Sequence, residues 1–268
     1  RPAAVDALLA DGAARGRVWV DASPEARVVP VRLPLSTSAL EDVARLRRET
    51  LDGLIASSYG LRLAFPGDLE RLSTTGYEQY RRLVETLPPR ARGALLRAAS
   101  VSHVVSPLDR AGEGVEPFAA VPGLREPRLL YRVRGPLPDV RVVGELRVHD
   151  GPGGLARILE ESPPDLVERA AFIDRGLLPG AGRRVLPPGS TGPTEGPWNL
   201  RVARRRSAHL EAEVSGPAGF LVVSGTFAPG WQARVDGRSA PIVPVNLAFR
   251  CVPFPPGTHV VEMSYSPF

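Results

Sequence analysis

The four histidines are the residues best suited to acid–base or metal chemistry, and their spacing does not favour either. His103, His149, His209 and His259 are scattered, and no second histidine or cysteine follows any of them two to four residues later. The single cysteine, Cys251, can form no intrachain disulfide, and its apolar neighbours predict a buried, inert thiol. We therefore expect no metal site, no cofactor and no catalytic residue in this chain.

Motifs for nucleophilic or phosphate chemistry are also missing from the sequence. There is no G-x-S-x-G turn and no P-loop. The glycine-rich stretches 151–154 and 176–182 do not join a strand to a helix with phosphate-loop spacing, so we interpret them as loops. Carboxylate pairs such as Glu160–Glu161 and Glu211–Glu213 occur in any chain of this size, and pairs for glycoside hydrolysis are defined by their separation in space.

Aromatic side chains are the remaining candidates for ligand contact, as surfaces on which a sugar ring stacks. Four of them lie in the last third of the chain: Trp198, Phe227, Trp231 and Tyr265. Stacking requires a flat ring that faces solvent. Core packing is the favoured interpretation of Trp231, whereas for Trp198 packing and ligand contact stay equally open.

The charge pattern argues against a nucleic-acid partner. All 34 basic residues are arginines, the net charge is +5, and arginines alternate with acids along the chain, as on solvated helix faces. Nucleic-acid binding requires a concentrated basic stripe or a known module, and neither is present. The one basic run, Arg204–Arg206, indicates an exposed strand end, with contact to anionic lipid or a sugar phosphate as the alternative.

Residues 1–186 predict a mixed α/β domain, and the fold class of the chain is α+β. Apolar spacing predicts helices within 1–16 and at 37–54, 75–87, 89–99 and 153–161. Alternating or β-branched runs predict strands at 17–21, 101–105, 129–133, 140–148 and 169–173. These elements follow no regular strand–helix–strand order, which favours α+β over a parallel α/β fold.

Residues 187–197 form a Pro/Gly-rich linker, after which the pattern changes to strands alone. Seven short runs between residues 198 and 268 predict a C-terminal antiparallel β-sandwich. Asp236–Gly237 predicts a type I′ hairpin turn, Gly257 a sharp reversal, and Pro229–Gly230 a turn that places Trp231 as a plug at one end of the sandwich core.

The order of these pieces resembles the closing β domain of YfhO-like bacterial membrane proteins. The likeness rests on Pro-Gly-Trp at 229–231, Val-Asp-Gly at 235–237, Asn-Leu-Ala-Phe-Arg at 246–250 and Gly-Thr-His at 257–259. Tyr59–Arg62 and Gly76–Tyr80 resemble earlier segments of the same family, and the likeness extends over about residues 55–268. Two departures are Glu78 in place of an expected aspartate and a longer interval between Gly60 and Gly76.

The resemblance implies a parent glycosyltransferase of the GT-C class, which transfers a sugar from a polyprenyl-phosphate donor to a cell-envelope acceptor. This chain would be its soluble domain on the extracytoplasmic face of the cytoplasmic membrane, acting as acceptor platform or lid, with the catalytic acid elsewhere in the parent. The implied partners are the transmembrane portion of the same polypeptide, a cell-envelope glycan or glycolipid, and the membrane surface. The candidate substrate-binding residues are Tyr59, Arg62, Tyr77, Arg250 and Trp198.

Two other functions stay open at this point. A freestanding secreted module for carbohydrate binding or adhesion would have the same strands, and a hydrolase would turn over glycosides by itself. The start at Arg1 without Met and the end at Phe268 directly after a strand pattern lead us to expect a piece of a longer protein. Membrane-spanning stretches in the flanking gene sequence would favour the glycosyltransferase over the secreted module.

Overall fold

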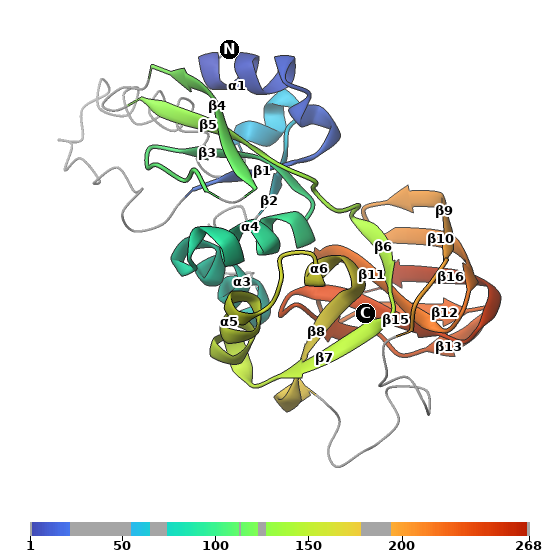
Figure 1. Ribbon diagram of the computed structural model, residues 1–268. Helices are drawn as coiled ribbons and strands as arrows, with labels where there is room; N and C mark the ends of the chain where they lie inside the picture. The colour runs from blue at the N-terminus through green and yellow to red at the C-terminus, as the bar shows by residue number, and fades with distance from the viewer. Residues whose placement is uncertain are drawn as a thin grey trace, which may run out of the picture. The chain divides into compact units, whose positions relative to one another are not determined.

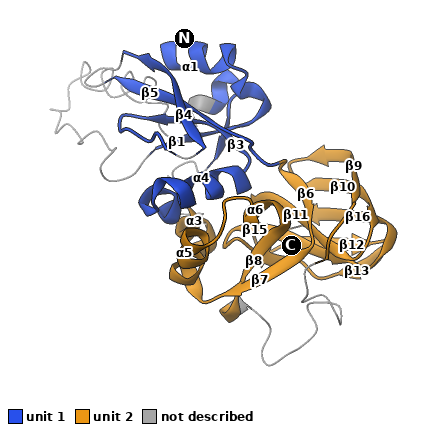
Figure 2. Cartoon of the chain, viewed as in Figure 1, with its two compact units in different colours: residues 1–73, 81–137 blue, residues 74–80, 138–268 orange. Residues whose placement is uncertain are grey.

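The computed structural model describes residues 2–21, 55–64, 74–112, 114–122, 127–177 and 194–266 (Figure 1). Helices and several sheets occur together, which confirms the α+β class. The chain divides into two compact units, Arg1–Ser73 with Arg81–Leu137 and Thr74–Tyr80 with Pro138–Phe268 (Figure 2). The helix predicted at 37–54 lies outside the described residues.

Unit 1 contains a five-stranded mixed sheet in the order β2-β1-β3-β5-β4. Strand β1 runs parallel to both β2 and β3, whereas β5 runs antiparallel to β3 and β4. The sequence analysis did not predict β2 or β4. The strands are β1 (Arg17–Val20), β2 (Arg62–Ala64), β3 (Val101–Ser106), β4 (Val115–Val121) and β5 (Arg128–Val133).

The helices of unit 1 form where the apolar spacing and proline signals place them. Helix α4 (Pro89–Ala98) begins with proline at its first position, where the missing N–H has no intrahelical partner to lose. Helix α3 (Thr75–Thr86) precedes it and is divided between the two units after Tyr80. The remaining elements are α1 (Ala3–Ala10), η1 (Ala13–Arg15) and η2 (Ile55–Tyr59), and α1 packs on a core that includes Val18 and Leu130.

Unit 2 begins with a strand that the sequence analysis predicted as continuous through residue 148, and the structure corrects this. Gly144 separates β6 (Val140–Val143) from β7 (Glu145–His149), and the two strands belong to different sheets. The Gly144 N–H donates to the Arg169 carbonyl, and a Cβ at Gly144 would lie 1.8 Å from the Thr194 carbonyl oxygen. The break therefore depends on backbone segments distant in the sequence.

Strands β7 and β8 (Ala170–Asp174) are parallel and connected by α5 (Gly151–Glu161) and α6 (Leu166–Arg169), and η3 (Arg175–Leu177) follows β8. This segment is a β-α-β unit, although residues 1–186 were predicted from the sequence to follow no regular strand–helix–strand order. The interpretation of residues 151–154 as a loop was also wrong, because they form the first turn of α5.

The C-terminal strands form a β-sandwich, as predicted. One sheet has the order β13-β12-β16-β10-β9 and the other β14-β15-β11-β6, and both are antiparallel. Apolar side chains of both sheets share one core, among them Ala212, Leu221 and Val252. The strands are β9 (Asn199–Arg206), β10 (His209–Gly216), β11 (Gly219–Thr226), β12 (Trp231–Val235), β13 (Arg238–Ala240), β14 (Val243–Val245), β15 (Phe249–Phe254) and β16 (Gly257–Tyr265).

The boundary between the units differs from the predicted linker at 187–197. Strand β6 pairs with β11 and contributes Val140 to the sandwich core, so the sandwich takes a strand from the predicted N-terminal domain. The division accordingly lies between Leu137 and Pro138.

The turns predicted at Asp236–Gly237 and at Gly257 are present in the sandwich. Asp236 and Gly237 have φ values of 52° and 74°, which are the two positive angles that a type I′ turn requires. Gly257 has a φ of 128° at the start of β16. Trp231 packs against the sandwich core at the end where β12 begins, as predicted.

Candidate functional site

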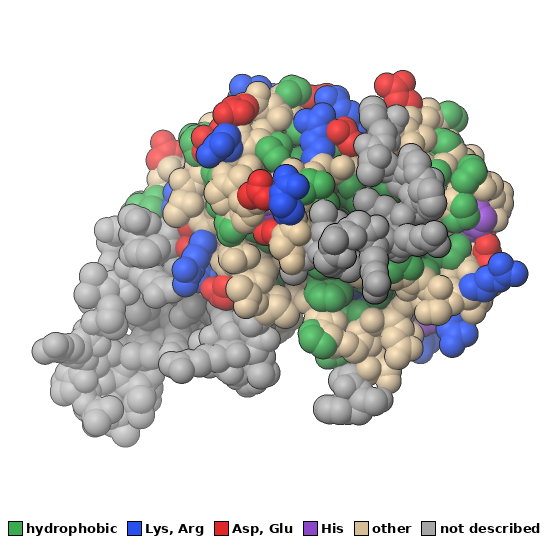
Figure 3. Space-filling view, turned by 90° about the horizontal axis from the view of Figure 1, so that it is seen from below, with side chains coloured by type: hydrophobic (Ala, Val, Ile, Leu, Met, Phe, Trp, Pro, Cys, Tyr) green, Lys and Arg blue, Asp and Glu red, His purple; other side chains and the backbone are tan. Residues whose placement is uncertain are grey.

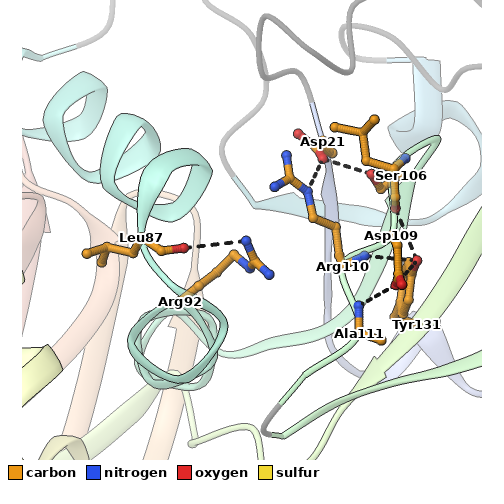
Figure 4. Close-up of polar contacts among 9 residues, drawn as sticks. Asp21, Leu87, Arg92, Ser106, Asp109, Arg110, Ala111 and Tyr131 are labelled. Carbon is orange, nitrogen blue, oxygen red and sulfur yellow. Dashed lines mark hydrogen bonds and ion pairs between the residues drawn. The ribbon is translucent and has the colours of Figure 1, made fainter.

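A polar cluster, buried at Asp21, Ser106 and Tyr131, lies at the carboxyl ends of β1 and β3 in unit 1. Asp21 directly follows β1, and Ser106 is the last residue of β3. Asp109 and Arg110 lie in the segment after β3, and Tyr131 comes from the neighbouring strand β5. We call these five residues the Asp21 cluster (Figure 4).

The Asp21 carboxylate is the centre of this cluster. Its side chain is fully buried, and its Oδ2 accepts hydrogen bonds from Ser106 Oγ at 2.8 Å and from Arg110 Nε at 2.6 Å (Figure 4). A buried carboxylate is tolerated only with such charged and hydrogen-bonding partners, because its desolvation otherwise costs several kcal/mol. Ser106 Oγ in turn accepts the Leu108 N–H at 2.9 Å. The hydrogen bonds of Asp21 with Ser106 and Arg110 therefore connect the end of β1 to the segment after β3.

The Tyr131 hydroxyl holds the same segment from the other side. It accepts the Arg110 N–H at 3.0 Å and lies 3.1 Å from the Leu108 carbonyl oxygen and 3.3 Å from Asp109 Oδ1. Asp109 Oδ1 also accepts the Ala111 N–H at 2.9 Å. Burial raises the pKa of Tyr131, so the phenol keeps its proton at neutral pH. Residues 108–111 are thus fixed by side chains of β1, β3 and β5.

Arg92 of α4 extends toward this cluster (Figure 4). Only 6% of the Arg92 residue is exposed, and its Nη1 donates to the Leu87 carbonyl at 3.4 Å. Its Nε is buried without a hydrogen-bond partner among the described residues. Burial lowers the pKa of Arg92, and the nearby positive charge of Arg110 lowers it further. The side chain is therefore a desolvated guanidinium with unused donors.

The position of the cluster in the sheet is the one at which ligands bind in many α/β proteins. In the order β2-β1-β3 the chain passes from β1 to β2 on one side and then from β2 to β3 on the other side of β1, and ligands of open parallel sheets bind outside the carboxyl ends of the strands at such a point. The sequence analysis missed these residues. Asp21 and Ser106 end two apolar runs, which was the available signal, but the parallel pairing of those runs was not predicted.

A second polar chain in unit 1 has the residue types of a serine-hydrolase relay. Ser102 Oγ lies 2.8 Å from His103 Nδ1, and His103 Nε2 lies 3.0 Å from Asp11 Oδ2. The Ser102 hydroxyl also lies 3.2 Å from the Arg17 carbonyl oxygen, and a Cβ at Gly16 would come within 2.0 Å of it. Because backbone covers the hydroxyl, the chain joins α1, β1 and β3 and does not present a nucleophile to a substrate.

Two of the predicted substrate-binding residues, Tyr59 and Arg62, lie in unit 1. The Arg62 guanidinium donates from Nη2 to the Arg15 carbonyl at 2.9 Å and from Nε to the Gly16 carbonyl at 3.3 Å, so it caps the end of η1. Tyr59 is partly buried against the core beneath α1. The pairing of β2 with β1 brings Arg62 beside Arg17.

The other three, Tyr77, Trp198 and Arg250, lie in unit 2. Tyr77 is partly buried in the first turn of α3, where its N–H lies 3.4 Å from Thr74 Oγ1. The Trp198 indole donates to the Pro217 carbonyl at 2.9 Å and is partly buried against the sandwich core. A Cβ at Gly144, Gly196, Gly216 or Gly219 would lie within 3.1 Å of an atom of this indole. Trp198 is therefore held by close backbone packing.

Arg250 and Trp231 form a stacked pair with Tyr265 beside them. The Arg250 guanidinium carbon lies 3.5 Å from the Trp231 ring centre, and the Trp231 and Tyr265 ring centres are 5.3 Å apart. Trp231 and Tyr265 are register partners on β12 and β16, so their side chains are on the same face. A bulge in β11 makes room for Arg250, because a Cβ at Gly225 would lie 2.3 Å from Arg250 Nη2. Arg250 is buried, whereas Trp231 is partly exposed and Tyr265 is 38% exposed. We call Trp231 and Tyr265 the aromatic pair.

Segments that carry the family resemblance lie side by side in unit 2. A Cβ at Gly76 would lie 1.9 Å from the Leu247 carbonyl oxygen, and the Tyr80 and Phe249 ring centres are 4.9 Å apart. Asn246 fixes this turn, since its Oδ1 accepts the Phe172 N–H at 2.8 Å and its own N–H donates to the Phe172 carbonyl at 2.6 Å. Asn246 and Leu247 have positive φ values, which these contacts hold in place.

Neither a protein-family model, nor a curated protein, nor a solved structure matches this chain. Within the described ranges, no helix has the length and apolar character needed to cross a bilayer. The same ranges contain no group of three or more histidine, cysteine, aspartate or glutamate side chains placed to hold a metal ion. On the face drawn in Figure 3, arginine and acidic side chains are interspersed.

Proposed function

We propose that this chain is the extracytoplasmic domain of a polytopic membrane glycosyltransferase, and that it contacts the cell-envelope acceptor without supplying the catalytic acid. The observation that carries the proposal is the aromatic pair at the end of the sandwich. Arg250 lies over the Trp231 ring and holds it in place, while Trp231 is partly exposed and Tyr265 is 38% exposed. Fixed aromatic rings of this kind suit the apolar face of a sugar.

The contacts of the family-like segments support the link to the YfhO-like family. Gly76 and Tyr80 are about 170 residues from Leu247 and Phe249 in sequence, yet they touch in the fold. Close backbone approach at Gly76 and the paired rings give physical reasons for those residue types at those positions. Resemblance in both segments is thus consistent with one shared structural unit.

Glycan binding to the purified chain tests the contact role. We expect bacterial envelope oligosaccharides to change the tryptophan fluorescence of the wild type in a saturable way. Tyr265→Ala should weaken this binding at least fivefold, whereas Tyr265→Phe keeps the ring and should bind like the wild type. Unchanged affinity in Tyr265→Ala, or no binding of any envelope glycan, contradicts the contact role.

The membrane assignment is tested separately by the gene. Encoded membrane-spanning segments next to this region, and protease access to the domain in spheroplasts, are the expected results. A signal peptide with no membrane span would instead favour the secreted carbohydrate-binding or adhesion module, which shares the aromatic pair.

A further inference from the structure

Arg92 is a buried residue of unit 1 whose hydrogen bonding is incomplete. Its guanidinium offers five N–H donors, and the one hydrogen bond that its side chain makes within the described ranges is a long contact of 3.4 Å to the Leu87 carbonyl. None of the described carboxylates forms an ion pair with it. Asp21 and Asp109 act on Arg92 as opposite charges, but neither carboxylate forms a direct ion pair with it. A guanidinium group in a residue that is only 6% exposed, with a buried Nε that has no hydrogen-bond partner, is costly to keep, which calls for a function.

The nearby carboxylates are already engaged. Asp21 accepts hydrogen bonds from Ser106 and Arg110, and Asp109 accepts the Ala111 N–H beside the Tyr131 hydroxyl. The positive charge of Arg110 lowers the pKa of Arg92, whereas the charges of Asp21 and Asp109 act in the opposite direction. A negative group that contacts both guanidinium groups would be attracted by both positive charges. Arg92 also lies at the end of the first turn of α4, and the amino end of a helix favours negative charge.

The surroundings are rigid enough to form a site. Side chains of β1, β3 and β5 fix residues 108–111, so Arg110 is held by both its backbone N–H and its Nε. The site lies at the carboxyl ends of parallel strands where the chain connections diverge. Arginine forks match the oxygens of phosphate in a bidentate way, and burial strengthens such bonds.

We propose that Arg92 on α4 and Arg110, which Asp21 and Tyr131 hold in place, form a binding site for a phosphate group. The phosphate is carried either by a soluble phosphate ester or by the headgroup of a phosphorylated lipid. This inference does not depend on the aromatic pair or on glycan binding, which lie in unit 2.

Calorimetric titration of the whole chain with inorganic phosphate tests the site. We expect saturable binding that weakens at least tenfold in Arg92→Met and less in Arg92→Lys, which keeps the charge without the fork. Arg82→Met is the matched control, because Arg82 is an exposed arginine on α3, and it should bind phosphate like the wild type. Equal affinity of Arg92→Met and wild type overturns the proposal, as does a lack of phosphate binding together with a lack of lipid binding.

Thermal unfolding separates this role from a structural one. Replacement of a buried charge by an apolar side chain of similar size is often neutral or stabilising, so Arg92→Met should keep or raise the unfolding midpoint while it loses phosphate affinity. A lower midpoint with unchanged phosphate affinity overturns the proposal.

Vesicle flotation distinguishes the two sources of the phosphate. Phosphatidylcholine vesicles that contain phosphatidic acid should capture the wild type in an Arg92-dependent manner if the ligand is a lipid headgroup, and inorganic phosphate should compete. Capture by phosphatidylcholine alone, or equal capture of Arg92→Met, overturns the lipid source, and the soluble ester then remains if the calorimetric result holds.

Discussion

At the scale of single residues, the Asp236–His259 pair shows how one turn makes the stability of the sandwich depend on pH. His259 Nδ1 donates to Asp236 Oδ2 at 2.7 Å, and Val260 N–H donates to Asp236 Oδ1 at 2.9 Å. The hydrogen bond from His259, followed by that from Val260, lowers the pKa of Asp236 below 3.8. The same bond to Asp236 raises the pKa of His259 above 6.5. The turn therefore carries a charged pair at mildly acid pH.

Asp236 and His259 should each stabilise the fold in a different pH range, and the two contributions are lost in opposite directions of pH. The Asp236 contribution is present above pH 3.8 and is lost as the pH falls through the lowered folded pKa. The His259 contribution is present below pH 6.5 and is lost as the pH rises through the raised folded pKa. We expect His259→Gln to flatten the decline in unfolding free energy above pH 6.5, measured by urea titration at several pH values. His209→Gln in the same sheet is the control, and a decline that persists in His259→Gln contradicts the assignment.

Asp11 makes a separate prediction for acid stability in unit 1. The hydrogen bond from Arg132, followed by that from His103, lowers the pKa of Asp11 from 3.8 to about 2, against an opposing effect of burial. Its contribution to stability is therefore present above pH 3.8 and lost as the pH falls toward 2. Asp11→Asn should unfold with less dependence on pH in this range, measured by acid titration of circular dichroism. An acid transition identical to that of the wild type would show that Asp11 does not contribute.

The contacts among the residues of the Asp21 cluster could not be predicted from the sequence. Asp21 and Ser106 are 85 positions apart, and their contact depends on the parallel pairing of β1 with β3. A hydrophobic pattern predicts that a strand exists, but it does not determine which strands pair with it in the sheet. For the same reason the sequence suggested Arg62 and Trp198 as ligand contacts, whereas the structure shows both in tight contact with backbone.

At the scale of elements, the long regular segments were predictable and the breaks were not. The helices at 75–87 and 89–99 and most strands of the sandwich follow their periodicities closely. The run from 140 to 148 is β-like on both sides of Gly144, so its division depends on the Arg169 and Thr194 backbones. Local pattern contains no information about such distant contacts, which is why the sequence analysis also missed the domain boundary at Leu137.

Two helical glycines should respond in opposite ways to the same substitution. In Gly76→Ala the new Cβ meets the Leu247 carbonyl, so overpacking should cost about 1–3 kcal/mol and outweigh the gain in helix propensity. In Gly153→Ala the Cβ meets nothing within 4 Å, so α5 should gain about 0.5–1 kcal/mol. Chemical denaturation of both variants measures the difference. Equal effects of the two substitutions would contradict the close approach at Gly76.

At the scale of the whole molecule, α3 belongs to both compact units. The part of α3 that belongs to unit 2 ends at the fully buried Tyr80, whose ring lies 4.9 Å from that of Phe249. A segment before residue 81 is therefore part of the core that residues 138–268 complete.

Tyr80→Ala should accordingly destabilise unit 2 although Tyr80 lies outside residues 138–268. Loss of a fully buried aromatic ring costs about 3–5 kcal/mol. Hydrogen exchange should show faster exchange in β15 and its neighbours, and Tyr77→Ala, at a partly exposed position of the same helix, should have a smaller effect. Unchanged protection of β15 in Tyr80→Ala would contradict the assignment of α3 to both units.

Strand β9 ends the larger sandwich sheet and carries four arginines on an exposed surface. Arg201 pairs with Glu213, and Arg205 with Asp139. An open strand edge can recruit a second copy of itself, and like charges along it oppose that recruitment. This row of guanidinium groups therefore acts as a barrier to self-assembly. Replacement of these arginines by neutral residues should therefore make pairing of this edge with a second copy more favourable.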